Sequence, residues 1–243
     1  MGMHLDHETA REWIAGWDRR HEREAACREE RLTVIADVVG RVTASAPRPS
    51  AVDLGSGSGT LAARLAERTP GMDVIAVDGD PLLLELGRQR HGASVRFVAA
   101  VIGRDGWTRA LGLDRPLDAA VSTGALQHLS EPVLFGVYEE LHRLLRPGGV
   151  LVNAGPLPLR GPRLTGRRRT ARPADEEDWS SWWAAQAWEA RRASMLERRE
   201  LSADGMGTGL GIDRHIELLR RAGFPHAGPV WRAGRGYVLA ALR

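Results

Sequence analysis

The sequence contains no lysine, so all 34 of its Lys and Arg side chains are arginines, and it contains only one cysteine, Cys27. Schiff-base catalysis, the phosphate-binding loop of P-loop NTPases and a lysine general base all need lysine, so these chemistries are excluded. A single cysteine allows no internal disulfide and no cysteine-rich zinc site. This usage favours a reducing compartment, and we expect a cytoplasmic protein.

The missing lysine also explains the charge of the chain, which is only +3 by formal count although the sequence pI is near 9.9. Above neutral pH only the amino terminus, Cys27 and the two tyrosines can titrate, so the net charge reaches zero only at about pH 10. The high pI therefore reports absent lysines and does not indicate a basic surface, and it gives no support to nucleic-acid binding.

Long apolar runs are absent as well. No stretch has the length of a membrane-spanning helix, and residues 1–20 are charged and lack the apolar segment of a secretory signal. With 43% hydrophobic and 27% charged residues, the 243-residue chain has the composition of an ordinary globular protein. We expect a soluble protein with one domain, an insertion and no membrane partner.

Strand-like and helix-like segments alternate through most of the chain, which indicates βαβ units and a parallel sheet. Residues 6–45 read as helical and end before two prolines. The predicted strands are 51–54, 73–77, 95–98, 117–121, 150–153, 229–232 and 237–242. The predicted helices that follow or separate them are 61–67, 81–89, 132–145 and 212–222.

The alternation is interrupted at residues 156–211. The stretch 160–172 is rich in arginine, proline and glycine, and the helix predicted after it carries four of the eight tryptophans. The arginine run is either a solvated loop, a site that attracts an anionic acceptor or an RNA, or part of an active-site lid.

A glycine loop follows the first predicted strand. Gly55, Gly57 and Gly59 stand between this strand and a helix, where glycine lets the backbone approach a ligand closely. Thr60 occupies the place of the third glycine of the dinucleotide fingerprint. Asp78 ends the second predicted strand, where a carboxylate can accept hydrogen bonds from both hydroxyls of a ribose. Together these features predict a nucleotide-like ligand at the carboxyl edge of the sheet.

Five motifs, in this order, resemble those of the class I S-adenosylmethionine (SAM) dependent methyltransferases. They are VDLGSGSGT (52–60), VIAVDGDP (74–81), PLDAAVSTGALQHL (116–129), LHRLLRPGGVLVNAG (141–155) and LLRRAGF (218–224). The resemblance implies a doubly wound α/β fold with a seven-stranded, mostly parallel sheet whose last strand is antiparallel. It divides a single domain, 1–243, into an N-terminal helical cap (1–46), a SAM-binding core (47–155 and 212–243) and a lid insertion after strand 5 (156–211).

The resemblance also implies SAM as the cofactor and S-adenosylhomocysteine as the product; no metal is expected, because the sequence has no carboxylate cluster. The glycines would pass under the methionine part, Asp53 would support their loop, and Asp78 would hold the ribose. An acid that reads the adenine amino group often follows the third strand in this family, but Val101 stands there, so we expect backbone groups and apolar contacts with Val101, Ile102 or Trp107 instead. Ser122 and Thr123 would border the sulfonium. The expected cofactor-binding residues are Asp53, Gly55, Ser56, Gly57, Gly59, Asp78, Gly79, Val101, Ile102, Ser122 and Thr123.

His128 is the candidate catalytic base, because it lies just past the fourth strand, where the family's acceptor approaches. A structural, hydrogen-bonded histidine beside the cofactor is an equal alternative. The tryptophans either pack a cap on the core or form an aromatic pocket for a flat or cationic acceptor. The expected substrate-binding residues are Trp13, Trp17, His21, Gln127, Trp182 and Trp183.

The expected function is methyl transfer from SAM to a small-molecule acceptor by in-line displacement, in specialised metabolism. Residues 122–125 lack the pattern of enzymes that methylate base amino groups, Cys27 is not placed for cytosine-C5 chemistry, and no carboxylate cluster suggests a metal. Three alternatives remain: cyclisation of SAM with release of methylthioadenosine, methylation of an RNA or protein, and a SAM-binding accessory subunit. The oligomeric state, monomer or homodimer, is left open by the sequence.

Overall fold

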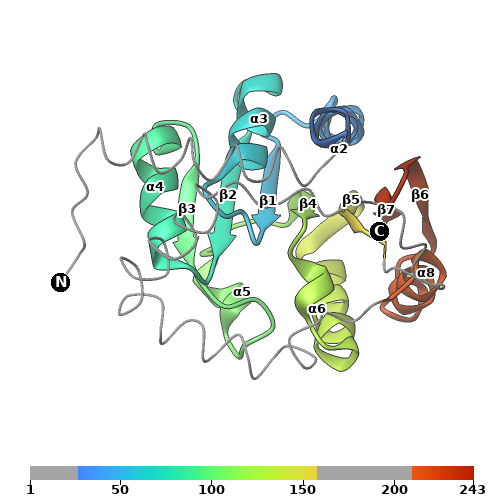
Figure 1. Cartoon of the computed structure of the whole chain (residues 1–243). Helices are drawn as coiled ribbons and strands as arrows, with labels where there is room; N and C mark the ends of the chain where they lie inside the picture. Colours follow the sequence, from blue (N-terminus) through green and yellow to red (C-terminus); the bar gives the residue numbers. More distant parts are fainter. Residues whose placement is uncertain (1–26, 158–209) are drawn as a thin grey trace, which may run out of the picture.

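A seven-stranded sheet forms the centre of the molecule, with the strand order β3-β2-β1-β4-β5-β7-β6 (Figure 1). The computed structural model describes residues 27–157 and 210–243. The strands are β1 (Ser50–Leu54), β2 (Asp73–Asp78), β3 (Arg96–Ala99), β4 (Leu117–Thr123), β5 (Leu145–Pro156), β6 (His226–Ala233) and β7 (Gly236–Leu242). Neighbours among β1–β5 pair in parallel, whereas β7 pairs antiparallel with both β5 and β6. The predicted doubly wound sheet with an antiparallel last strand is confirmed.

Helices cover both faces of this sheet. Those described are α2 (Arg28–Thr43), α3 (Thr60–Arg68), α4 (Pro81–His91), α5 (Trp107–Ala110), α6 (Glu131–Leu144) and α8 (Ile212–Arg221), with a short 3-10 helix, η1 (Leu126–His128). In Figure 1, α2 and α3 lie above the sheet and α5 and α6 lie below it. One apolar core joins the sheet to α2 and α3, and a second joins it to α5, α6 and α8.

The alternation of side chains along each central strand supplies both cores. In β1, Val52 and Leu54 face the core of α5, α6 and α8, whereas Ala51 faces the core of α2 and α3. Every residue of β1 is buried. A strand buried on both faces reads as a continuous apolar run, which is why the central strands were recognisable in the sequence.

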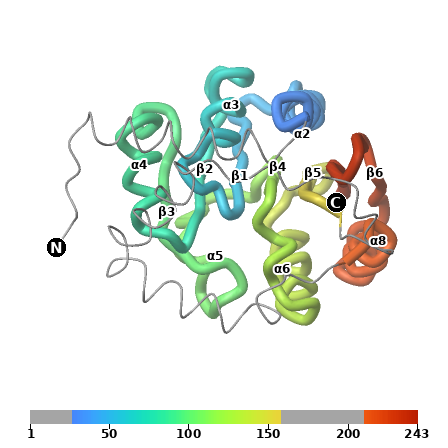
Figure 2. The backbone as a smooth tube through the Cα atoms, viewed as in Figure 1, coloured from blue at the N-terminus to red at the C-terminus, as the bar shows by residue number. Residues whose placement is uncertain are grey.

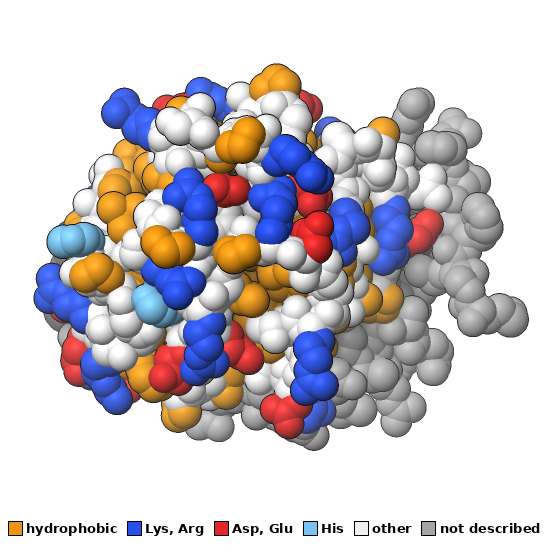
Figure 3. All heavy atoms as spheres, turned by 180° about the vertical axis from the view of Figure 1, so that it is seen from behind, with side chains coloured by type: hydrophobic (Ala, Val, Ile, Leu, Met, Phe, Trp, Pro, Cys, Tyr) orange, Lys and Arg blue, Asp and Glu red, His pale blue; other side chains and the backbone are white. Residues whose placement is uncertain are grey.

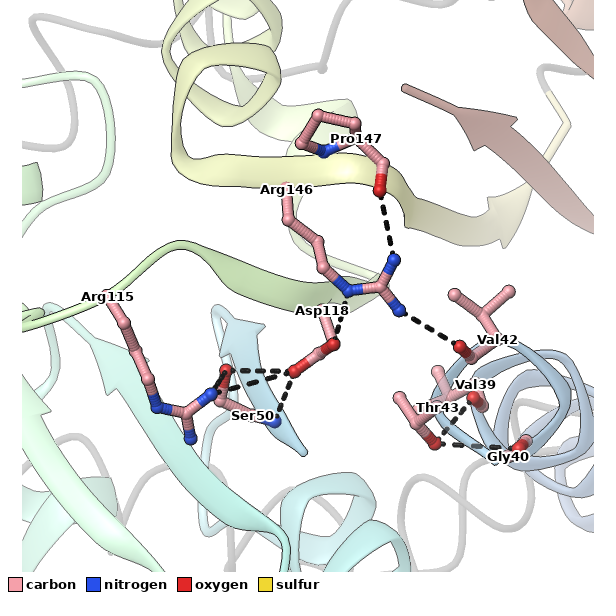
Figure 4. A network of polar contacts seen from close by, with 9 residues as sticks. All are labelled: Val39, Gly40, Val42, Thr43, Ser50, Arg115, Asp118, Arg146 and Pro147. Carbon is pink, nitrogen blue, oxygen red and sulfur yellow. Dashed lines mark hydrogen bonds and ion pairs between the residues drawn. The ribbon is translucent and has the colours of Figure 1, made fainter. Parts of the chain in front are cut away.

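A partly buried ion pair between Arg146 and Asp118 fastens α2 to the edge of the sheet opposite the glycine loop (Figure 4). The Arg146 guanidinium donates from Nε to Asp118 Oδ1 over 2.6 Å and from Nη2 to the Val42 carbonyl over 3.1 Å. The second oxygen of Asp118 accepts from the Ser50 amide over 2.9 Å. One arginine therefore joins the end of α2 to β4 and β5, and its carboxylate partner holds the start of β1.

The limits of some elements differ from those predicted. β5 begins at Leu145, five residues before the predicted start, because Leu145 already pairs with Leu117 before a shift in register. The predicted helix 132–145 therefore ends at Leu144. β6 spans more than the predicted 229–232; it is the edge strand, where Pro229 needs no ladder partner for its missing N–H. The short α5 and η1 were not predicted.

The cap and the lid can be compared with the structure only in part. α2 lies within the predicted helical segment 6–45, but residues 1–26 are outside the described residues, as are residues 158–209 of the predicted insertion. The division of the domain into cap, core and lid thus stays a prediction.

The strand order reverses between β1 and β4, and this places the expected ligand crevice. β1 and β4 pair side by side, yet the chain leaves β1 for α3 on one face and leaves β4 for α6 on the other (Figures 1 and 2). In open α/β sheets, ligands bind outside the carboxyl ends of the strands at such a reversal. The loops after β1 and β4 are therefore the place to look for a site.

Charged side chains are mixed on the face of the molecule that Figure 3 shows. Arginines lie among acidic side chains there and do not form one continuous basic stripe. This distribution agrees with the small net charge of the chain.

Candidate functional site

The glycine loop between β1 and α3 has a backbone that only glycine adopts easily. Gly55, Gly57 and Gly59 have φ angles of 68°, 57° and 82°, in the left-handed region. A Cβ on Gly55 would lie 2.2 Å from Cβ of Ala125, so this glycine also allows the loops after β1 and β4 to touch. The loop is anchored at its start, where the amides of Gly55 and Ser56 donate to the Val77 carbonyl over 2.8 and 3.0 Å.

Asp78, at the end of β2, lies against this loop. Its Oδ2 accepts from the Gly57 amide over 2.9 Å, and its Oδ1 accepts from the Asp80 amide over 2.8 Å. Asp80 in turn caps α4 by accepting from the Leu82 amide over 3.0 Å, with Pro81 in the first turn. The Asp78 carboxylate is thus held in one orientation beside the glycine loop, where the sequence predicts the ribose. That role stays a prediction.

Asp53 is the buried acid beneath the loop. Its Oδ2 accepts from the Ala62 amide of α3 over 3.1 Å, which ties the first turn of α3 to β1. Burial raises the pKa of Asp53 to about 7, against the opposing effect of the Ala62 hydrogen bond, and the charge of Asp78 raises it further. Near neutral pH this carboxyl is therefore close to the balance between its neutral and ionised forms.

Several buried polar atoms around the loops have no hydrogen-bond partner in the part of the chain that the structure describes. They include Asp53 Oδ1, Ser56 Oγ, Thr123 Oγ1 and Gln127 Oε1. Three of these residues lie at, or just after, the carboxyl ends of β1 and β4, and Asp53 lies one residue before the end of β1. Because buried polar groups in folded proteins are nearly always hydrogen-bonded, such a group of atoms points to a polar ligand. SAM, with its ammonium and hydroxyl donors, fits this set of acceptors.

Ser122 and Thr123, predicted to border the sulfonium, differ in their contacts. The hydroxyl of Ser122 donates to the Leu54 carbonyl over 2.9 Å and so joins the ends of β4 and β1. The hydroxyl of Thr123, in contrast, has no hydrogen-bond partner among the described residues. Of the pair, Thr123 is therefore the better candidate for a direct contact with SAM.

The region predicted for adenine has an open cavity of about 610 Å³ after β3. Val101 lines it, together with Ala100 and residues of the loop that leads into α5. A Cβ on Gly79 would lie 3.1 Å from Cγ2 of Val101, so Gly79 keeps the end of β2 close to this wall. Ile102 packs against the core, and Trp107 is buried with its indole N–H donating to Glu140. Val101 and Trp107 thus both line the cavity, whereas Ile102 packs against the core.

His128 and Gln127 lie in η1, directly after β4. The His128 side chain is exposed, and its amide donates to the Ala125 carbonyl over 3.0 Å. The turn before it is fixed by the Gly124 amide, which donates to the Ala154 carbonyl over 2.9 Å. The loop therefore holds its backbone rigidly at the carboxyl edge of the sheet and leaves the imidazole accessible.

The other predicted substrate residues, Trp13, Trp17, His21, Trp182 and Trp183, lie outside the described residues, as does the arginine run 160–172. No helix within residues 27–157 and 210–243 is long and apolar enough to cross a membrane. Over the same residues, no group of three or more His, Cys, Asp or Glu side chains is arranged to hold a metal ion.

Sequence reasoning missed a buried polar cluster next to Gln127. It consists of Tyr138, Asn153, His215 and Tyr237, joined by hydrogen bonds. His215, on α8, is only 1% exposed and therefore lies in the core and not on the helix surface. The hydrogen-bonded partners are 15 to 77 residues apart in the sequence, so no local sequence pattern predicts the cluster.

Known proteins with similar sequences are methyltransferases, and the matching residues include the glycine loop. Residues 51–149 match the family described as "Methyltransferase domain". A trans-aconitate 2-methyltransferase of Methylobacterium radiotolerans is 36% identical over 128 residues, which are 51% of this chain and 44% of that protein. The match thus spans less than half the length of that curated relative.

Two solved structures show the same fold. An O-methyltransferase family protein from Burkholderia thailandensis superposes with a TM-score of 0.56 at 20% identity, over 87% of this chain and 55% of the other. Human N-acetylserotonin methyltransferase in complex with SAM gives a TM-score of 0.52 at 19% identity, over 87% of this chain and 54% of the other. In its fold, and in the sequence of residues 51–149, the chain is thus similar to methyltransferases.

Proposed function

We propose that this protein transfers a methyl group from SAM to a small-molecule acceptor by in-line displacement. The observation that carries the proposal is a set of buried oxygens beside the glycine loop that have no hydrogen-bond partner among the described residues: Asp53 Oδ1, Ser56 Oγ and Thr123 Oγ1. The O-methyltransferase fold neighbours and the trans-aconitate methyltransferase relative support a small acceptor.

When bound, SAM supplies a methyl group on a positively charged sulfur, which is already activated for displacement. The residues of the chain then have to bind and orient, since positioning alone can supply much of the acceleration of such a reaction. Asp78 is held to receive the ribose, and the unpaired oxygen of Asp53 suits the ammonium end. A cation there would favour the ionised form of Asp53 and lower its pKa again.

For an acceptor that arrives protonated, we propose His128 as the base. Its imidazole is exposed on η1, immediately after the strand that ends at Thr123. Replacing His128 by Asn should lower kcat by about 100-fold, the lower end of what general-base catalysis contributes, with SAM affinity unchanged. His226→Asn, on the exposed edge strand β6, is the matched control. Unchanged kcat in His128→Asn would assign His128 the structural role instead.

The acceptor is proposed to be a small organic acid or a hydroxylated aromatic molecule. These are the two classes that the names of the similar trans-aconitate and N-acetylserotonin methyltransferases suggest. A role in specialised metabolism and a cytoplasmic location are part of the same proposal. The latter rests on the single cysteine of the chain.

The test is to incubate the protein and SAM with trans-aconitate, with N-acetylserotonin, and with no acceptor, and to identify the products by mass spectrometry. S-adenosylhomocysteine formed only in the presence of an acceptor supports methyl transfer. Methylthioadenosine formed from SAM alone would show that SAM is cyclised, and absence of SAM binding by calorimetry would overturn the proposal as a whole.

A further inference from the structure

Arg31, near the start of α2, carries a buried donor that the described residues leave unused. Its Nε is buried and has no hydrogen-bond partner among them. The two acids that precede it bind other groups. Glu29 pairs with Arg64 of α3, and Glu30 accepts from the indole N–H of Trp231 over 2.9 Å. Because buried polar groups in folded proteins are nearly always hydrogen-bonded, this guanidinium points to an acceptor that the described side chains do not supply.

The charges around Arg31 indicate that the missing acceptor is an anion. Arg28 lies three positions earlier, and residues three apart share one face of a helix. Burial lowers the pKa of Arg31, and the positive charge of Arg28 lowers it further, so the charged form of Arg31 is destabilised in its present surroundings. A partly buried cation beside a like charge is costly unless a negative group neutralises it. A carboxylate or a phosphate of a ligand would supply that group.

Arg31 lies at the same edge of the sheet as the glycine loop. The end of α2 lies at the opposite edge, where the Val42 carbonyl accepts from Arg146. Arg31 precedes Val42 by about three turns, or about 16 Å, and the five-residue strand β1 spans about 17 Å. The side chain of a helical residue also leans toward the N-terminus of its helix. The guanidinium is therefore directed to the carboxyl edge of the strands.

The pairing of α2 with α3 supports this placement. The two helices lie side by side (Figure 1). Glu29, near the start of α2, pairs with Arg64, and Asp37, farther along α2, pairs with Arg68, which is farther along α3. The helices thus run in the same direction. Since α3 begins directly after Gly59, the start of α2 also lies at the edge of the glycine loop.

Two unpaired oxygens lie on the face of the sheet that α2 covers. Ala51 and Val121 belong to the core formed with α2 and α3, and successive side chains of a strand alternate between its faces. Asp53 and Thr123, each two residues farther along the same strands, therefore point to the α2 face. Asp53 Oδ1 and Thr123 Oγ1 have no partner among the described residues. A donor for an anion and acceptors for a cation thus share one edge and one face.

A ligand can reach this edge from solvent. Arg31, Ser56 and Thr123 are each only partly buried, and Gly124, which follows Thr123, is exposed. Ser56 Oγ, on the glycine loop, is a further oxygen without a partner among the described residues. A ligand that lies over the glycine loop therefore approaches the guanidinium and both hydroxyls without opening the core.

We propose that Arg31 binds the carboxylate of the amino-acid end of SAM, whose ammonium group then faces the unpaired oxygens of Asp53 and Thr123. The amino-acid end matches this set because it carries an anion and a cation on the same carbon atom. SAM without its carboxylate would leave Arg31 unpaired, so Arg31 makes the site specific for the complete amino-acid end. This inference rests on the proposed methyl transfer from SAM and adds a specificity-determining residue to its binding site.

The test is calorimetry with two probes that differ only in the carboxylate, S-adenosylhomocysteine and decarboxylated S-adenosylhomocysteine. The wild-type protein should bind the first about tenfold or more tightly, as expected for hydrogen bonds between charged groups. Arg31→Met keeps an unbranched apolar side chain and should lose this preference, with the affinity for the decarboxylated probe within about threefold of wild type. An Arg31→Met variant that keeps the wild-type preference would overturn the inference.

Two further variants and a stability measurement accompany this test. Arg41→Met, at an exposed position in the last turn of α2, is the matched control and should keep the full preference. Arg31→Lys keeps the charge without the planar fork and should keep part of it. Ligand-free Arg31→Met should have a urea midpoint at least equal to that of wild type, because it removes an unpaired, partly buried cation. A lower midpoint with an unchanged preference would assign Arg31 a purely structural role.

A carboxylate of the acceptor is the other source of the anion, and trans-aconitate titrated into protein saturated with S-adenosylhomocysteine distinguishes it. If Arg31→Met loses trans-aconitate binding but keeps the preference for S-adenosylhomocysteine, the anion belongs to the acceptor and the inference is wrong. If the wild-type protein binds neither SAM nor S-adenosylhomocysteine, the proposed function fails. If it binds S-adenosylhomocysteine and the decarboxylated probe equally well, only the present inference fails.

Discussion

At the scale of single residues, the burial of Asp53 favours its neutral form, whereas binding of a cationic ligand would favour its ionised form. Asp53 is fully buried beneath the glycine loop, and burial raises its pKa to about 7, whereas an ionised oxygen there would suit a cationic ligand. A carboxyl whose pKa is raised on folding destabilises the protein as the pH rises from the unfolded to the folded pKa. In the absence of ligand, Asp53 should therefore lower the free energy of unfolding progressively as the pH rises from about 4 to about 7, and the full loss should remain above pH 7.

Asp53→Asn mimics the protonated acid and should remove this cost. We expect the variant to gain about 2–4 kcal/mol over the wild-type protein when the pH is raised from about 4.5 to about 8, and to bind SAM at least tenfold more weakly. Urea unfolding at both pH values measures the first effect and calorimetry the second. Asp73→Asn, an exposed acid on β2, is the control. A difference between variant and wild type that is independent of pH would show that Asp53 does not titrate in this range.

Gly55 must be glycine for two reasons: its backbone has a positive φ, and the neighbouring loop leaves no space for a side chain. Its φ of 68° disfavours any side chain, and an added Cβ would overlap Ala125 at 2.2 Å. Gly71 has a similar φ of 83° but nothing within 4 Å, so Gly71→Ala measures the conformational cost alone.

We expect Gly71→Ala to lose about 1 kcal/mol of unfolding free energy and Gly55→Ala about 2–4 kcal/mol. Only Gly55→Ala should weaken SAM binding, by at least tenfold, because the loops after β1 and β4 would be forced apart. Thermal unfolding and calorimetry on both variants provide the comparison. Equal losses of stability in the two would mean that the loops adjust to the extra atom.

At the scale of elements, the attachment of α2 depends on Asp118 and Arg146. Asp118 is 3% exposed and binds both the Arg146 guanidinium and the Ser50 amide, so replacing it leaves a partly buried arginine without its counter-charge. The pair between Arg68 and Asp37 also joins two helices, at 2.6 Å, but both of its side chains are close to half exposed.

Asp118→Asn should therefore lower the unfolding free energy by about 2–4 kcal/mol, whereas Asp37→Asn should change it by less than about 1 kcal/mol. Neither substitution should alter the affinity for SAM, because both pairs lie away from the loops after β1 and β4. Denaturant unfolding in low and high salt distinguishes the two. A comparable loss in Asp37→Asn would contradict the argument from burial.

The sequence predicted the elements whose signal is local. Glycines at 55, 57 and 59 and the acid at 78 were recognisable because a close approach of backbone to ligand allows few other residues. The Asp118–Arg146 pair was not predicted, and neither was the buried cluster of Tyr138, Asn153, His215 and Tyr237, since their partners come together only when the sheet is assembled. α5, a single turn, is too short for a helical period to show.

At the scale of the whole molecule, the two ends of the neighbouring strands β1 and β4 have separate roles. The amino ends of β1 and β4 carry the contacts of Asp118, which hold the sheet to α2, while their carboxyl ends carry the glycine loop, Thr123 and the turn at Gly124. Stability and ligand binding are thus placed at opposite edges of one sheet. This separation explains why a substitution at one edge should leave the property of the other edge nearly unchanged.

Hydrogen exchange with and without S-adenosylhomocysteine tests this separation across the molecule. A ligand present at 100 times its Kd should add about 2.7 kcal/mol to the unfolding free energy, so amides that exchange only by global unfolding slow everywhere. Amides that exchange by local opening should slow at 55–59, 78–80, 101–103 and 123–125 alone, since these loops surround the unpaired acceptors. The amides of 226–228 and 230, beside a separate cavity of about 380 Å³ at the edge strand, are the internal reference. Local protection at these amides without protection at 55–59 would place the ligand at the other side of the sheet, and the glycine loop would then need a different explanation.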